Sequence, residues 1–118
     1  MIRQTRHATR RSLARIGCAA ATLALVAACA KSPESIMPIS MAGAFDGTTC
    51  AAARALLATE AQSLATLNER QRGAVAGDAI GVLLIGVPMG SLTGNNVEGQ
   101  IAATRGKVIA LEARLTTC

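Results

Sequence analysis

The chain has 118 residues, of which 51% are hydrophobic and only Phe45 is aromatic, so a large core built on aromatic packing is excluded and one small domain is the upper limit. The formal net charge of +5 comes from arginines near the start, which are Arg3, Arg6, Arg10, Arg11 and Arg15. Subtracting these five from the 12 basic residues leaves 7, which equals the 7 acidic residues. The neutral remainder argues against nucleic acid as a partner.

The first 28 residues have the layout of a secretory signal peptide. An arginine-rich stretch, residues 1–15, precedes an apolar run, residues 16–28, that is too short to cross a bilayer as a mature helix. The run leads into LVAAC, residues 25–29, which resembles the lipobox of bacterial lipoproteins. The resemblance implies removal of residues 1–28 and attachment of diacylglycerol to the thiol of Cys29. An ordinary signal peptide cleaved beside a cysteine is the alternative.

Two further features bear on export and location. Residues 9–15, TRRSLAR, resemble a twin-arginine motif, and both the twin-arginine and the general secretory routes remain open. Ala30 follows Cys29, and by resemblance to enterobacterial lipoproteins a residue other than aspartate there implies the outer membrane. We therefore expect a lipid-anchored envelope protein on the periplasmic face of the outer membrane, with the inner membrane not excluded.

The remaining cysteines predict a disulfide. Cys18 is removed with the leader and Cys29 is lipidated, so Cys50 and Cys118 are left together in an oxidising compartment. A bridge between two chains is the alternative. The only histidine, His7, lies in the leader, so no zinc or haem spacing and no Ser-His or Cys-His nucleophile exists in the mature chain. We predict no catalytic residue, no metal, no cofactor and no enzymatic activity.

The mature chain divides into a tether and a helical region. Residues 29–45 contain two prolines and no hydrophobic period, which predicts a lipidated N-terminus followed by a flexible tether. Residues 46–118 favour an all-α fold, an antiparallel two-helix hairpin whose first helix is capped by Asp46, Thr48 or Thr49 and runs to about Ile85. Asn95, Asn96 and Glu98 are typical of the start of the second helix.

The two predicted helices have apolar seams that match each other. In an antiparallel pair, facing positions add to a constant, and one register brings Cys50 to Cys118, Leu57 to Leu111 and Leu67 to Ile101. The same register places Glu60 near Val108 and within reach of Lys107. The disulfide would then close the open end of the hairpin, which we expect near the lipid anchor.

The closed end of the hairpin is glycine-rich and apolar. Glycines recur at nearly every fourth position from Gly73 to Gly94, and Pro88 predicts a break in the helix. Asp78 is expected to cap a helix segment that begins at Ala79. An ordinary small core, a contact with another envelope protein, and self-association or insertion in a bilayer remain open for this tip. The residues predicted for such a contact are Ile80, Val82, Leu83, Leu84, Ile85, Val87, Met89 and Leu92.

Residues 78–118 resemble the C-terminal part of small proteobacterial lipoproteins of unknown function. The likeness is carried by LIGVP at residues 84–88, by Ile101-Ala102, by Arg105-Gly106 and by Ala110-Leu111. It implies the helical architecture and brings no activity. The sequence therefore predicts a non-enzymatic, lipid-anchored envelope protein with a structural or protein-interaction role. The alternative is a membrane-active or self-associating hairpin that inserts its glycine-rich tip in the bilayer.

Overall fold

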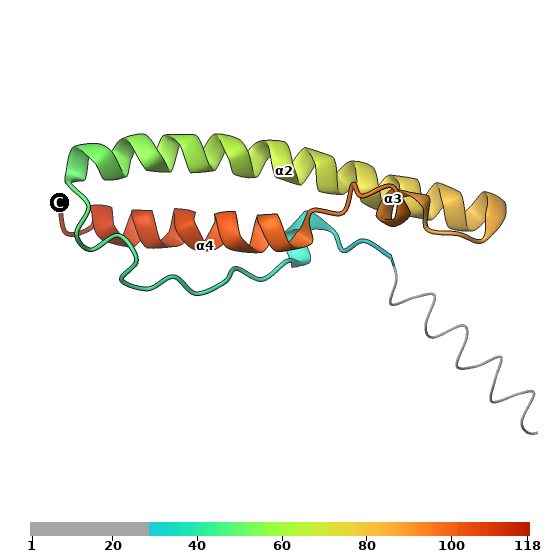
Figure 1. Cartoon of the computed structure of the whole chain (residues 1–118), viewed down its shortest axis with the longest axis horizontal. Helices are drawn as coiled ribbons and strands as arrows, with labels where there is room; N and C mark the ends of the chain where they lie inside the picture. Colours follow the sequence, from blue (N-terminus) through green and yellow to red (C-terminus); the bar gives the residue numbers. More distant parts are fainter. Residues whose placement is uncertain (1–28) are drawn as a thin grey trace, which may run out of the picture.

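The computed structural model describes residues 29–118, and within this part of the chain all regular structure is helical (Figure 1). In chain order the elements are a single 3-10 turn, η1 (Pro33–Ser35), and three α-helices, α2 (Cys50–Ile85), α3 (Met89–Leu92) and α4 (Glu98–Leu115). The predicted all-α class is confirmed. The predicted signal peptide, residues 1–28, lies outside the described residues.

Helix α2 is the longest element and determines the length of the fold. Its N-cap is Thr49, one of the three candidates from the sequence, and the Thr49 side chain accepts a hydrogen bond from the backbone N–H of Ala52 at 3.3 Å. The helix has 36 residues, or a length of about 54 Å. It ends at Ile85, and its C-cap Gly86 has a φ of 72° and donates its N–H to the carbonyls of Gly81 and Val82.

Helix α4 packs along the first part of α2 (Figure 1). Ile101 and Leu111 are fully buried, and Leu64 and Leu67 pack against the cluster that contains Ile101. At one end of the pair, the Cα atoms of Cys50 and Cys118 are 5.9 Å apart and their sulfur atoms are bonded. Few large side chains are buried between α2 and α4, so the core of this pair is narrow.

Polar side chains fix the position of α4 at two points. Lys107 pairs with Glu60 at 3.0 Å, the contact that the sequence indicates. Gln71 is fully buried, and its Oε1 accepts the backbone N–H of Val97, directly before α4, at 2.7 Å. Because α4 thus begins beside Gln71, the rest of α2, residues 72–85, extends about 20 Å beyond it.

Residues 30–45 differ from the flexible tether that the sequence predicts. Ile36 and Pro33 are buried, and Ile36 belongs to the same apolar cluster as Ile101. Hydrogen bonds hold the segment at several points: the Gln71 Nε2 donates to the Lys31 carbonyl at 2.8 Å, Arg105 to the Ile36 carbonyl at 2.6 Å, and the Ile39 N–H to the Ala102 carbonyl at 3.0 Å. The segment is therefore a third layer of the fold.

The N-terminal end of the described chain lies at the far end from the disulfide. Figure 1 shows the segment passing from the neighbourhood of α3, along α4, to the start of α2. The disulfide is therefore distant from Cys29, the residue expected to carry the lipid, and the expectation that the two lie close together is wrong. The segment had no hydrophobic period from which its direction could be predicted.

Removal of the disulfide tests how much it stabilises this narrow core. We expect the double variant Cys50→Ser, Cys118→Ser to lose about 4 kcal/mol of unfolding free energy, because the bond closes a long loop in the unfolded chain. Chemical denaturation followed by circular dichroism measures the loss. An unchanged transition would show that the bond does not constrain the unfolded chain.

Candidate functional site

The candidate site is the glycine-rich end of α2 together with the chain that folds back on it. We call residues 79–92 the apolar tip. After Gly86 the chain turns at Val87 and Pro88, and the four-residue helix α3 packs against α2. This short helix was not predicted, because four residues are too few to show a hydrophobic period.

Three of the glycines permit this close packing. A Cβ at Gly77 would lie 3.2 Å from the Cα of Gly90, and one at Gly90 would collide with the carbonyl of Ala74. A Cβ at Gly81 would collide with the carbonyl of Val87. The glycine spacing is therefore used for contact between α2 and the returning chain. A Cβ at Gly73, by contrast, would meet open space.

The carboxylate of Asp78 is at the centre of this end of the molecule. It is 1% exposed, and its Oδ1 accepts the backbone N–H of Ser91 at 2.7 Å. Its Oδ2 accepts the Ser91 hydroxyl at 2.6 Å and the backbone N–H of Ala30 at 2.6 Å. One side chain of α2 thus holds both α3 and the start of the N-terminal segment.

The hydrogen bonds also determine the ionisation of Asp78. Burial alone would raise its pKa, but donation by the Ser91 hydroxyl and by the backbone N–H groups of Ala30 and Ser91 outweighs burial and lowers the pKa below 3.8. Asp78 is therefore a charged, fully hydrogen-bonded group at neutral pH. The expected cap at Ala79 is wrong, since α2 continues through that position and Asp78 binds groups distant in sequence.

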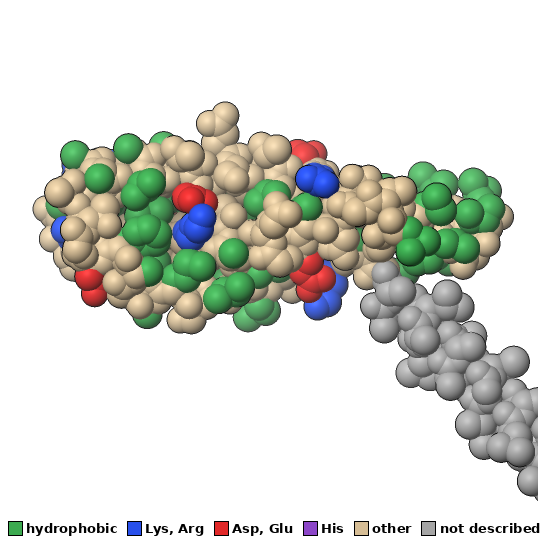
Figure 2. All heavy atoms as spheres, in the orientation of Figure 1, with side chains coloured by type: hydrophobic (Ala, Val, Ile, Leu, Met, Phe, Trp, Pro, Cys, Tyr) green, Lys and Arg blue, Asp and Glu red, His purple; other side chains and the backbone are tan. Residues whose placement is uncertain are grey.

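The tip exposes most of the side chains that were predicted to make its contact. Leu83 is 83% exposed, and the others are Leu84 at 74%, Leu92 at 68%, Ile85 at 63%, Ile80 at 59%, Val82 at 43% and Met89 at 41%. Only Val87 is half-buried. Figure 2 shows these apolar side chains gathered at one end of the molecule. They do not form the small core that was one of the alternatives.

Charged residues are confined to the remainder of the described chain. No Asp, Glu, Lys or Arg occurs between Asp78 and Glu98. The nearest ion pairs join Lys31 to Glu98 at 2.7 Å and Arg72 to Glu34 at 3.0 Å. Both of these cations are paired with acids, and Arg70 donates to the carbonyl of Gly94 at 3.1 Å.

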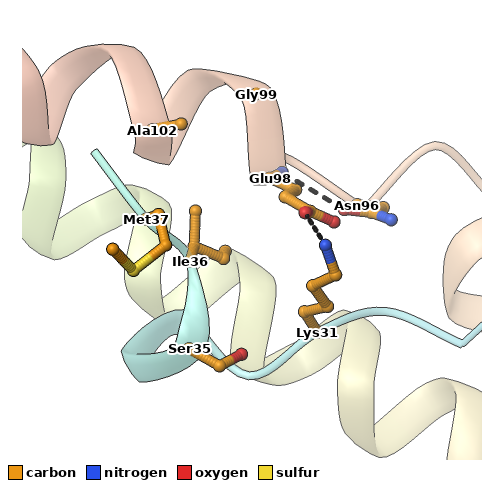
Figure 3. Close-up of a pocket in the computed structure, with 8 residues that line it drawn as sticks. All are labelled: Lys31, Ser35, Ile36, Met37, Asn96, Glu98, Gly99 and Ala102. Carbon is orange, nitrogen blue, oxygen red and sulfur yellow. Dashed lines mark hydrogen bonds and ion pairs between the residues drawn. The ribbon is translucent and has the colours of Figure 1, made fainter. Parts of the chain in front are cut away.

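A shallow pocket lies where the N-terminal segment meets α4 (Figure 3). Lys31 reaches across it to Glu98, and Ile36, Met37 and Ala102 supply apolar lining. No cluster of three or more His, Cys, Asp or Glu side chains suited to a metal is found within residues 29–118. The pocket is best explained as the joint between the N-terminal segment and α4.

Within the same residues, no helix combines the length and apolar content that a membrane crossing requires. Searches against protein-family models, curated proteins and solved structures found no significant match.

The sequence indicated which residues form the tip, leaving open whether they are buried or exposed, and it gave no indication of the contacts of Asp78 with Ala30 and Ser91. The signal that was available is the isolation of Asp78, the only charge in a long apolar stretch. Such a residue needs hydrogen-bond partners when it is buried. The identity of the partners was not predictable, because two of the three donors are backbone N–H groups.

Replacement of Asp78 tests the central cluster. We expect Asp78→Asn to lower the unfolding free energy by about 2 kcal/mol, because it removes the charge and turns an amide donor toward N–H groups. Glu112→Gln, an exposed change of the same kind, should alter it by less than about 0.5 kcal/mol. Denaturant titration measures both, and equal effects would contradict the central role of Asp78.

The lowered pKa of Asp78 determines how the difference in unfolding free energy between the wild type and Asp78→Asn depends on pH. The stabilisation by its charge is present above the ordinary pKa of 3.8 and is lost as pH falls through the lower pKa of the folded protein. The stability gap between the wild type and Asp78→Asn should therefore be constant near neutral pH and narrow only below about pH 4.

A pair of glycine substitutions tests the close packing of α3. Gly90→Ala should destabilise the protein by about 2 kcal/mol, because the new methyl group collides with the Ala74 carbonyl. Gly73→Ala should stabilise it by up to about 1 kcal/mol, since the residue is helical and its surroundings are open. Thermal unfolding compares the two, and shifts of the same sign would contradict the packing.

Proposed function

We propose that this chain is a lipid-anchored cell-envelope protein without enzymatic activity, whose antiparallel helical hairpin and glycine-rich tip serve a structural or protein-interaction role. The lipobox at residues 25–29 supports acylation of Cys29. The observation that carries the proposal is the contact of Ala30, the next residue, with Asp78. A lipid on Cys29 is thereby attached to a fixed point of the fold.

The fixed position of Ala30 determines where the helices lie relative to the proposed lipid. Since residues 30–45 are packed against α4, they provide no loose tether between the lipid and the helices. Helix α2 then runs about 42 Å from Asp78, which holds Ala30, to Cys50 of the disulfide. The protein acts as a spacer that presents its disulfide end away from the membrane, where an envelope partner makes contact. The periplasmic face of the outer membrane remains the proposed location.

Self-association through the glycines is the weaker alternative. Helices that associate through small residues need those residues on an outward face. Gly77 and Gly81 instead face the returning chain, where Gly90 and Val87 lie against them. The exposed surface of the tip consists of large aliphatic side chains, so glycine-mediated pairing is not favoured.

Acylation can be tested directly in the producing bacterium. Labelling with palmitate should mark the wild type and the Cys18→Ser variant, whose change lies in the leader, but leave Cys29→Ser unmarked. Mass spectrometry of the mature protein should find an acylated N-terminal Cys29. A mature chain that begins elsewhere, or that carries no lipid, would overturn the proposal.

A further inference from the structure

We propose that the apolar tip inserts into the same lipid leaflet as the acyl chains of Cys29, so that lipid and tip form one two-part membrane anchor. The inference rests on the proposed acylation for its choice of a bilayer. It goes further by assigning the membrane-contacting residues, which are Leu83, Leu84, Ile85 and Leu92, and the end of the molecule that faces the lipid.

The proposed acylation site lies beside the apolar tip. The Ala30 N–H lies 2.6 Å from Asp78, and Cys29 precedes it by a single residue, a Cα separation of about 3.8 Å. Asp78 is directly before the apolar tip in α2. Acyl chains on Cys29 therefore start at the base of the tip, and a leaflet that receives them lies within reach of the exposed leucines.

The exposed surface of the tip is aliphatic. Leu83, Leu84 and Leu92 are each more than two-thirds exposed, a degree of exposure that water disfavours for adjacent aliphatic side chains. The side chains cannot turn inward, because Gly77, Gly81 and Gly90 hold the backbones too close together to leave room. A hydrocarbon layer is the environment that suits such a surface.

The length of the tip and its lack of charged side chains both suit insertion into one leaflet. Residues 79–85, the charge-free end of α2, extend about 10 Å beyond Asp78, which suits entry into one leaflet and is too short for a bilayer core of about 30 Å. The absence of charges from residue 79 to 97 lets this end enter hydrocarbon without burying an ion.

The proposal can be tested by fluorescence, because the chain has no Trp. Leu83→Trp introduces one fluorophore at the tip, and Leu56→Trp is a matched control at an exposed leucine near the disulfide end. The mature, acylated variants are reconstituted in phosphatidylethanolamine and phosphatidylglycerol vesicles. Emission is then compared with and without phospholipids that carry bromine on their acyl chains.

We expect the tryptophan at position 83 to emit at shorter wavelength and to lose at least half of its intensity to the brominated lipid, while the tryptophan at position 56 keeps its intensity. Emission at position 83 that stays long in wavelength and unquenched would overturn the proposal. So would a shift without quenching by bromine, which would show that a second copy of the chain covers the tip.

Mass spectrometry of the same preparations separates this proposal from the acylation on which it rests. An acylated Cys29 with an unquenched tip would retain the lipid anchor and reject insertion. Quenching at position 83 in a preparation whose Cys29 carries no lipid would support insertion and reject the anchor. The Asp78→Asn change, added to Leu83→Trp, should reduce the quenching, because it loosens the acylated end from the tip.

Discussion

The hydrogen bonds of Asp78 join three parts of the chain that are distant in sequence. The carboxylate belongs to α2, one bound N–H belongs to Ala30, and the remaining donors belong to Ser91 in α3. Burial of a charged carboxylate is costly unless its oxygens are hydrogen-bonded. The N-terminal segment and α3 must therefore both be in place for Asp78 to be stable where it is, which makes this end of the molecule cooperative.

The glycines explain why this cooperative end has an apolar exterior. In an ordinary small domain, large aliphatic side chains fill the space between helices. Here Gly77, Gly81 and Gly90 bring two backbones into contact, so no space remains for Leu83 or Leu84 between them. Close packing inside the tip thus forces the aliphatic side chains outward, and their exposure is a consequence of the fold.

The parts of the fold that were predictable from the sequence depend on local signals. The Thr49 cap, the end of α2 at Gly86 and the seam through Leu67 and Ile101 each follow from residue type and spacing. The course of residues 30–45 was not predictable, because Gln71 and Arg105 bind main-chain carbonyls, which every residue supplies. The same holds for Asp78, whose partners include main-chain N–H groups.

The hydrogen bond between Asp78 and Ala30 can form whether or not Cys29 carries a lipid. Its donor is the peptide N–H that follows Cys29, and acylation of the thiol or of the Cys29 amine leaves that N–H unchanged. The tip can therefore fold identically before and after the proposed modification. The position of the lipid, by contrast, depends on the fold, because Asp78 fixes Ala30 beside the tip. Under the proposed acylation, the folded protein determines which of its ends faces the membrane.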